Sequence, residues 1–237
     1  MEKVFWVGGR KGGVGKSMVA LAYLDYLIAM GEAPLLIESD TANGDVLRCY
    51  ESTIKTETAD LSDANGWVDL LNVIAGFSGP VVINSKGSQE VSGAGEGLQY
   101  LPDAGKEIIA LWVINAEPDS IKALKDFMEA VPTAKIAVVR NLFFGKPHAF
   151  GLFDHSKTRE AVLNAGGTVI DFPAVATRVA RDLKTACLSI ENAAKDLPFG
   201  SRIELQRWRK AVHQAFNGLT LCEKGETKWA SKRSTRK

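Results

Sequence analysis

A glycine-rich loop with two lysines contains the residue types in this sequence that are best suited to chemistry. The loop runs from Gly9 to Ser17 with the sequence GRKGGVGKS and directly follows the apolar segment Val4 to Val7. Glycines let a loop curl so that several backbone N–H groups converge on phosphate oxygens. Lys16 can then reach the outer phosphates, and the Ser17 hydroxyl can bind magnesium at the start of the next helix. The loop therefore predicts a site for the phosphates of a nucleotide.

The loop departs from the general phosphate-loop pattern G-x-x-x-x-G-K-[ST], because Arg10 stands where the first glycine belongs. The segment from Lys11 onward, KGGVGKS, resembles the deviant Walker A motif K-G-G-x-G-K-[ST] of the ParA/MinD family of ATPases. The resemblance implies a cis role for Lys16 and, in an ATP-dependent homodimer, a trans role for Lys11 at the partner's phosphates. It also implies that ATP and Mg²⁺ are bound by Gly12, Gly13, Val14, Gly15, Lys16, Ser17 and Met18. The alternative is a glycine-rich turn with two exposed lysines.

The spacing of apolar residues predicts the elements that position this loop. We expect a first strand at 4–7, further strands at 33–37, 80–84, 108–115, 134–139 and 168–172, and helices at 17–30, 67–77, 119–131, 156–165, 175–187, 189–195 and 201–217. We expect a surface connection at 53–65, a weakly helical stretch at 88–101 and a loop at 142–154. This alternation predicts an α/β fold, a doubly wound, mostly parallel twisted sheet with helices on both faces. By resemblance it is a P-loop NTPase fold.

The composition favours one domain in the cytoplasm. With 237 residues, 46% of them hydrophobic, the chain suits a single ATPase domain over 1–220, followed by a basic tail over 221–237. A net charge of +1 argues against a globally basic nucleic-acid binder. Cys49, Cys187 and Cys222 lie far apart, which predicts reduced thiols. No apolar run approaches the length of a membrane span, so we expect no membrane attachment.

A carboxylate-containing segment follows the second expected strand. Glu38 to Asp45, ESDTANGD, lies where the ParA/MinD family carries a D-x-D-P-Q-G-N-type switch I segment, and Asp40 matches its second aspartate. The resemblance implies that Asp40 orients the attacking water and approaches the magnesium shell. The alternative is that Asp40 and Asn43 cap the turn or helix after the strand.

The strand at 80–84 ends in Asn84, where the family has the switch II aspartate that holds a magnesium-bound water. The resemblance therefore places Asn84 beside the metal together with Ser17 and Asp40. An amide oxygen still accepts a hydrogen bond from water, but it brings no negative charge, so we expect weaker magnesium binding and slow turnover. Asp103 is the nearest carboxylate after this strand, but it lies in a loop pattern and we do not assign it to the site.

Two later strand ends match family positions around the nucleotide base. The resemblance implies that Asn141 reads the adenine edge and that Pro173 walls the base. Residues of both types also end strands for structural reasons, so a turn former at Asn141 and a strand stop at Pro173 remain the alternatives. The sequence alone leaves both interpretations open.

The C-terminal region combines an apolar helix face with basic residues. On the expected helix 201–217, one face carries Leu205, Trp208, Val212 and Phe216, and we place His213 on the helix surface. The helix also carries basic residues, and the tail adds Lys224, Lys228, Lys232, Arg233, Arg236 and Lys237. Non-specific attraction to DNA phosphates or to an acidic partner is one interpretation, and a docked helix with a solvated tail is the other.

The whole pattern indicates a nucleotide-dependent switch. The absence of an N-terminal helix-turn-helix extension, the segment 199–202 (FGSR) and the pair Trp208-Arg209 look most like the small plasmid-encoded StbB/TraL-type members of the family. That resemblance implies an ATP-dependent homodimer with a plasmid-encoded protein partner, acting in plasmid partition, stability or conjugative transfer. Two alternatives remain: an ATP-binding module with little or no hydrolysis, which Asn84 favours, and a P-loop kinase or amidoligase-like enzyme. Most such enzymes lack a lysine at the position of Lys11.

Overall fold

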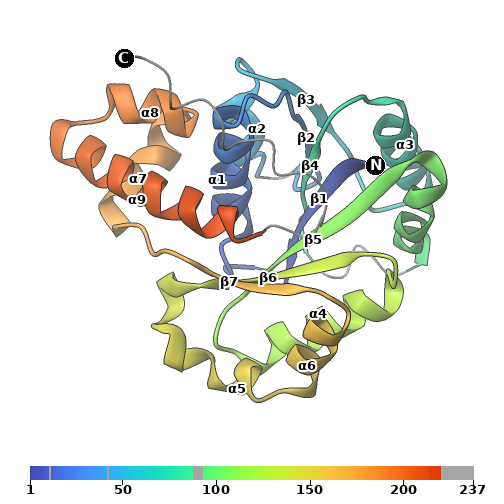
Figure 1. Cartoon of the computed structure of the whole chain (residues 1–237). Helices are drawn as coiled ribbons and strands as arrows, with labels where there is room; N and C mark the ends of the chain where they lie inside the picture. Colours follow the sequence, from blue (N-terminus) through green and yellow to red (C-terminus); the bar gives the residue numbers. More distant parts are fainter. Residues whose placement is uncertain (11, 42, 88–92, 220–237) are drawn as a thin grey trace, which may run out of the picture.

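An all-parallel sheet forms the middle of the molecule in the computed structural model, which describes residues 1–10, 12–41, 43–87 and 93–219 (Figure 1). Within these ranges, seven strands are arranged in the order β3-β2-β4-β1-β5-β6-β7, and each pairing is parallel. The strands are β1 Glu2–Gly9, β2 Leu35–Glu38, β3 Lys55–Thr58, β4 Val81–Asn84, β5 Lys106–Ile114, β6 Lys135–Asn141 and β7 Thr168–Phe172. The predicted doubly wound α/β fold is confirmed.

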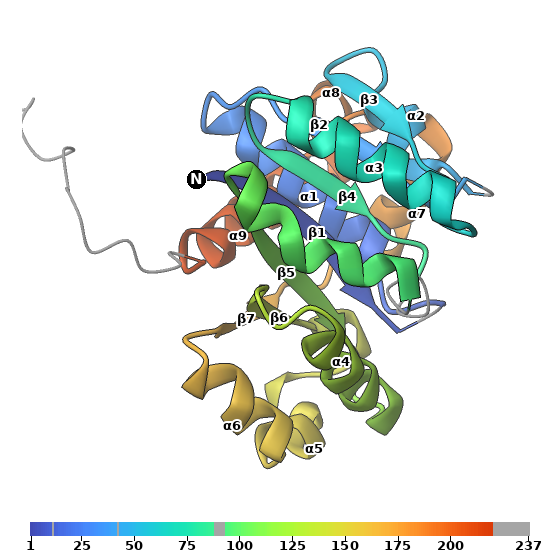
Figure 2. The same cartoon turned by 90° about the vertical axis from the view of Figure 1, so that its right-hand side faces the viewer.

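Helices cover both faces of this sheet (Figures 1 and 2). One face packs against α1 Lys16–Ala29, α2 Asp45–Tyr50, α7 Thr177–Ala186, α8 Ile190–Asp196 and α9 Phe199–Asn217. The other packs against α3 Ala64–Gly76, the 3-10 segment Gly93–Ala104, α4 Pro118–Ala130, α5 Gly151–Asp154 and α6 Lys157–Asn164. Each face thus has its own hydrophobic core.

The sequence of β1 shows why the strand sits between these two cores. Phe5 and Val7 point to the face covered by α1, whereas Val4 and Trp6 point to the opposite face. A strand buried on both faces is an almost continuous apolar run, as expected for a parallel sheet with helices on either side. On the second face the Trp6 ring stacks on Trp67 of α3 at a centroid distance of 6.0 Å. Strand β1 is therefore held firmly up to the loop that follows it.

The expected surface connection at 53–65 is wrong in part, because it contains β3 and the start of α3, and helix α2 just before it was also not predicted. Strand β3 has the sequence KTET and pairs with β2 at the edge of the described sheet. An edge strand needs no apolar alternation, since part of its side-chain surface faces water. The expected loop at 142–154 likewise contains two 3-10 turns, Leu142–Phe144 and Pro147–Phe150, and α5.

Helix α9 buries the predicted apolar face, since Leu205, Trp208, Val212 and Phe216 are at most 2% exposed. The surface position expected for His213 is wrong. Its Nε2 lies 2.7 Å from Oδ2 of Asp25, a buried residue of α1, and Arg209 Nε donates to the same oxygen at 2.7 Å. Because α9 packs across α1, its polar side is also drawn against that helix.

Some predictions fall on residues outside the described ranges. These include Lys11, Cys222 and the basic tail over 221–237. The other two cysteines, Cys49 and Cys187, lie within the described part of the chain and are free thiols. In that part, the helices are too short or too polar to cross a membrane.

Substitution of Asp25 tests how strongly α9 is held. In Asp25→Ala, Arg209 loses its partner in a largely buried pair, so we expect a loss of about 2–4 kcal/mol in the free energy of unfolding. Urea denaturation followed by circular dichroism measures the change. Glu204→Ala is the matched control, because it removes an ion pair on α9 whose arginine, Arg207, is exposed, and it should cost less than about 1 kcal/mol. Equal losses in both variants would contradict a special role for Asp25.

Candidate functional site

The glycine-rich loop joins the carboxyl end of β1 to helix α1. Gly12, Gly13 and Gly15 have φ angles of +80°, +71° and +96°, in the left-handed region that side chains other than glycine rarely adopt. Gly15 is the N-cap of α1, and no side chain in the described part of the chain caps the first turn, which contains no acidic residue. The N–H groups of such a turn need an acceptor from outside the helix, and the helix dipole favours an anion there. Loop and helix together form a cradle that fits phosphate.

The charged residues of the loop are arranged around this cradle. Lys16 Nζ donates to the backbone oxygen of Arg10 at 3.3 Å, so its ammonium group lies across the loop. Arg10 forms an ion pair of 2.8 Å with Asp119 in the first turn of α4, which ties the departing loop to the neighbouring helix. Ser17 and Met18 follow Lys16 in the first turn of α1, where both are half-buried. Apart from Lys11, the loop residues predicted from the sequence thus lie together.

Asn141 fastens the loop from the end of β6. Its Nδ2 donates to the backbone oxygen of Val14 at 2.9 Å, and its Oδ1 accepts from the backbone N–H of Phe143 at 3.1 Å. A Cβ atom on Gly15 would collide with this amide, so glycine is needed there for space as well as for its positive φ. The second hydrogen bond is that of a turn after a strand. The expected contact of Asn141 with adenine stays a prediction.

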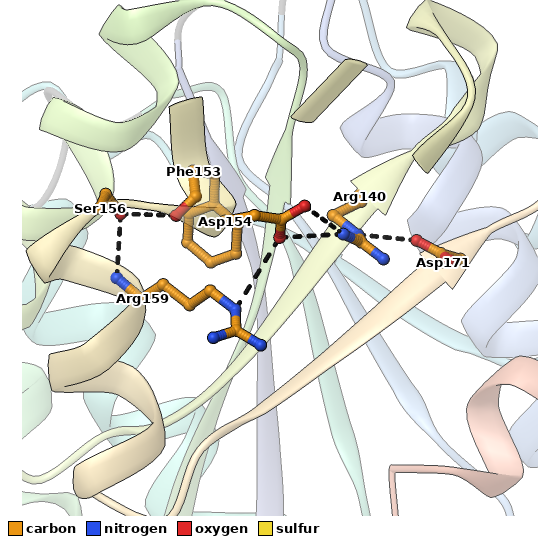
Figure 3. Close-up of polar contacts among 6 residues, drawn as sticks. All are labelled: Arg140, Phe153, Asp154, Ser156, Arg159 and Asp171. Atoms are coloured by element: carbon orange, nitrogen blue, oxygen red, sulfur yellow. Dashed lines mark hydrogen bonds and ion pairs between the residues drawn. The ribbon is translucent and has the colours of Figure 1, made fainter. Parts of the chain in front are cut away.

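Arg140 braces the strand end on which Asn141 lies (Figure 3). Its Nε donates to Asp171 of β7 at 2.7 Å, and its Nη1 donates to both carboxylate oxygens of Asp154 at 3.0 and 2.9 Å. Asp154 is the last residue of α5, and its Oδ1 lies 3.8 Å from Nε of Arg159 in α6. Charge-assisted contacts of this kind fix the geometry of the groups they join. This cluster was not predicted, although an arginine at the end of an apolar strand was a visible signal.

Glu38 and Asn84 form a buried pair at the carboxyl ends of β2 and β4. The two residues are register partners, are 1% and 2% exposed, and are joined by a hydrogen bond of 2.8 Å from Asn84 Nδ2 to Glu38 Oε1. Asn84 is also the register partner of Val7 in β1, the strand that leads into the loop. Asn84 was expected near the metal, whereas Glu38 was given no role, although it stands where the D-x-D segment has its first aspartate. The hydrogen bond joins residues 46 positions apart, so no local pattern revealed the pairing itself.

Asp40 lies next to this pair, in a turn. Its backbone oxygen accepts from the N–H of Gly44 at 2.9 Å, and its Oδ2 accepts from Asn43 Nδ2 at 3.0 Å. These are the contacts of the turn-forming alternative. Its other carboxylate oxygen, Oδ1, is buried and has no hydrogen-bond partner among the described residues. The expected role of Asp40 beside the metal and the attacking water stays a prediction.

Burial raises the pKa of Glu38 to about 7. The hydrogen bond from Asn84 and the backbone N–H groups of Asp40 and Leu47 favour the charged form, and the nearby Asp40 carboxylate opposes it. Desolvation outweighs the favourable contacts because the side chain is almost completely removed from water. In the absence of a nearby cation, the Glu38 carboxyl group therefore gains or loses its proton near neutral pH.

The side-chain oxygens of Glu38, Asp40 and Asn84 at the carboxyl edge of the sheet could bind magnesium only together with a further ligand. Within the described ranges, no group of three or more histidine, cysteine, aspartate or glutamate side chains is arranged to hold a metal ion by itself. Mg²⁺ is commonly held by one or two carboxylates, waters and the phosphates of a nucleotide. The Ser17 hydroxyl and the buried oxygens around Asn84 match that set.

Pro173 follows β7 at the far side of the same edge. It is half-buried, and its backbone oxygen accepts a hydrogen bond of 2.8 Å from Trp208 Nε1 of α9. Residue 173 is thus the point where β7 is linked to the C-terminal helix. The expected role of Pro173, to form one wall of the pocket for the nucleotide base, stays a prediction.

Comparisons with known proteins agree with this architecture. The chain is 42% identical over 225 residues to protein MobD from Acidithiobacillus ferrooxidans, with 92% of this chain and 98% of MobD covered. The septum site-determining protein MinD from Pyrococcus horikoshii, complexed with Mg-ADP, superimposes with a TM-score of 0.51 at 14% identity, covering 90% of this chain and 96% of that chain. The MinC:MinD cell division protein complex from Aquifex aeolicus gives 0.51 at 15% identity, covering 90% and 96%. No protein-family model matches.

The raised pKa of Glu38 predicts a pH-dependent effect of Glu38→Gln on stability. The folded-state pKa lies above that of the unfolded chain, so the protonated carboxyl stabilises the fold at low pH and this contribution is lost as pH rises toward 7. The free energy of unfolding of Glu38→Gln, relative to wild type, should therefore be roughly 1–3 kcal/mol higher at pH 8 than at pH 5. Urea denaturation in EDTA at both pH values measures this difference. Glu57→Gln, on the adjacent strand β3, controls for the loss of one charge. A pH-independent difference for Glu38→Gln would contradict the assignment.

The Asn141 contact predicts that the loop depends on β6. In Asn141→Ala the Val14 oxygen loses its donor, so we expect faster hydrogen exchange in peptides covering residues 8–15 and a loss of about 1–3 kcal/mol in stability. Hydrogen–deuterium exchange with mass spectrometry measures both local and global opening. Asn115→Ala is the matched control, because Asn115 directly follows β5 but its side-chain oxygen accepts hydrogen bonds from Ser120 and from the backbone N–H of Glu117 instead of contacting the loop. Similar exchange of residues 8–15 in both variants would rule out the contact as the loop's fastening.

Proposed function

The chain belongs to the same family as MobD from Acidithiobacillus ferrooxidans, and on this premise we propose that it is an ATP-binding switch ATPase of the ParA/MinD type. In this proposal, two copies associate when ATP is bound and separate after hydrolysis. The observation that carries the proposal is the phosphate cradle at the carboxyl edge of the sheet, with its three left-handed glycines and the uncapped N-terminus of α1. A structure of the same fold complexed with Mg-ADP supports it.

The loop residues take the following roles. Backbone N–H groups from Gly12 to Met18 bind the phosphates, and Lys16 neutralises the outer ones. Ser17 and the oxygens near Asp40 and Asn84 would hold Mg²⁺, which would supply positive charge beside the phosphates. Asp40 orients the water, and Lys11 contacts the phosphates of the partner copy.

The surroundings of the base are assigned to the late strand ends. Asn141, held against Val14, has a second Nδ2 hydrogen with which it can donate to an adenine nitrogen. Pro173, after β7, closes the side of the base pocket. Both assignments rest on the resemblance to the ParA/MinD family and on the location of both residues at the carboxyl edge of the sheet.

The biological role that we propose is plasmid partition, plasmid stability or conjugative transfer in the cytoplasm, together with a plasmid-encoded protein partner. The name of the MobD relative agrees with a role in mobilisation. The likeness to StbB/TraL-type proteins supports the same setting. Basic residues of the tail, outside the described ranges, supply non-specific contacts to DNA.

A second candidate function is an ATP-binding module with little hydrolysis. It is favoured by Asn84, because the neutral amide replaces a carboxylate at the end of β4, and by the buried position of that amide, which is 2% exposed. Such a module would hold ATP tightly, with negligible turnover. The rate of steady-state ATP hydrolysis distinguishes it from the switch.

Solution mass by light scattering tests the proposal. We expect wild type to be dimeric with Mg²⁺ and ATP and monomeric with ADP. Lys11→Ala should bind ATP and remain monomeric, whereas Lys16→Ala should bind ATP at least about 10-fold more weakly, since one phosphate contact of roughly 1.4 kcal/mol or more is lost.

Lys125→Ala is the control for these two variants, because Lys125 is an exposed lysine of α4. It should behave as wild type. A wild-type protein that binds ATP but stays monomeric would contradict the dimeric switch and leave the binding module. A wild-type protein that binds no nucleotide would contradict both.

A further inference from the structure

A cavity of about 540 Å³ lies at the edge of the sheet where the strands begin. Its lining includes the first residues of β1 and Pro80, which directly precedes β4. The glycine-rich loop follows the other end of β1, so a rise of about 3.3 Å per residue separates cavity and loop by roughly 20 Å. Most of the lining side chains are apolar or aromatic, among them Phe5, Tyr23, Tyr26, Leu27, Phe216 and Leu219.

The wall that α1 contributes carries a buried hydroxyl group. Tyr23 is 4% exposed, and its hydroxyl makes no hydrogen bond to any residue in the described ranges. Its ring is held by Phe5 and Phe216, with centroid distances of 4.7 and 5.0 Å. Burial raises the pKa of Tyr23, and the neighbouring Tyr26 adds to the rise, so the hydroxyl keeps its proton and can donate it. Because buried hydroxyls nearly always have a partner, this one indicates an occupant of the cavity that accepts a hydrogen bond.

The last described residue of the chain lies in the wall of the same cavity. Helix α9 ends at Asn217, whose Oδ1 accepts a hydrogen bond of 3.0 Å from the Tyr26 hydroxyl. The backbone N–H of Leu219 then donates to the Phe216 oxygen at 2.9 Å, and the half-buried Leu219 side chain lines the cavity. The segment 220–237 therefore starts at the cavity.

The first residues of that segment have the chemistry that the cavity requires. Thr220, Leu221 and Cys222 carry no charge, and the charged residues begin at Glu223. A chain extends by at most about 3.6 Å per residue, which places Leu221 within roughly 7 Å of Leu219. A peptide brings both an apolar side chain for the walls and carbonyl oxygens for a hydroxyl donor. A hydrocarbon molecule would leave the hydroxyl unpaired.

We infer that Leu221 fills this cavity and that a backbone carbonyl of residues 220–222 accepts the hydrogen bond of Tyr23. The cavity is thus the docking site of the chain's own C-terminal segment. The six basic residues from Lys224 to Lys237 then start at the edge of the sheet opposite the glycine-rich loop. Contacts of the tail with an anionic partner such as DNA would therefore be made away from the nucleotide. The docking itself does not depend on the proposed nucleotide function.

Hydrogen–deuterium exchange with mass spectrometry of the full chain tests this inference. Residues 220–222 should exchange at least about 10-fold faster in Leu221→Asp than in wild type, because burial of the leucine is lost and a carboxylate is costly among apolar walls. Ala230→Asp is the matched control, since it makes the same change of charge in the same tail beyond the docked residues. It should leave the exchange of residues 220–222 as in wild type.

Tyr23→Phe tests where the segment docks, because it keeps the ring and removes only the hydroxyl. Exchange of residues 220–222 should become about 3-fold faster or more, since one hydrogen bond is lost. Tyr50→Phe is the control: the Tyr50 hydroxyl donates to the backbone oxygen of Leu21 at 3.0 Å and Tyr50 does not line the cavity. Unchanged exchange in Tyr23→Phe would place the segment elsewhere and overturn the inference.

Equal exchange of residues 220–222 in wild type and Leu221→Asp would also overturn it. Protection that survives in Leu221→Asp but is lost in Trp229→Asp would make Trp229 the occupant, against the inference. Extra mass on wild type in native mass spectrometry, with residues 220–222 unprotected, would identify a small molecule as the occupant and would likewise contradict it. Nucleotide binding is measured separately, so its failure would refute the proposed function and leave the docking in place.

Discussion

The position of β1 between β4 and β5 is the constraint on which the rest of the structure depends. All three strands run in the same direction, with Val7 opposite Asn84 on one side and Leu111 on the other. Parallel strands end at a common edge, and ligands in such sheets bind there. The loop after β1 therefore starts beside Asn84 at the end of β4, with Glu38 at the end of β2 one strand further, and Asn141 at the end of β6 reaches it from the other side.

The sequence was sufficient for the loop, the order of most elements and the fold class, because these depend on local patterns of glycine and apolar residues. It was insufficient for β3, whose KTET sequence pairs at a sheet edge and carries no apolar alternation. It was also insufficient for Glu38 and His213, since their surroundings come from residues 46 and 188 positions away. The glycines of the loop, whose φ angles of +71° to +96° depend on local sequence, were thus visible, whereas contacts between residues far apart in the chain were not.

Helix α1 connects the two charged regions of the molecule. Its N-terminus follows the glycine-rich loop and has no side-chain cap among the described residues, and within its length Asp25 is 2% exposed and holds Arg209 and His213 of α9. Removing charge from water is costly unless it is paired, so the contact with α9 keeps α1 in one orientation. The C-terminal helix, far from the phosphate loop in sequence, thereby supports the helix that forms one side of the cradle.

The hydrogen bond between Asn141 and Val14 spans 127 positions of the chain. A ribosome adds roughly 5–20 residues per second, so the loop is made roughly 6–25 s before the residue that fastens it. During that time β1 also waits for β5, its neighbour on one side. The loop is thus synthesised early but completed late, and a nascent chain shorter than 141 residues lacks the side chain that fastens it.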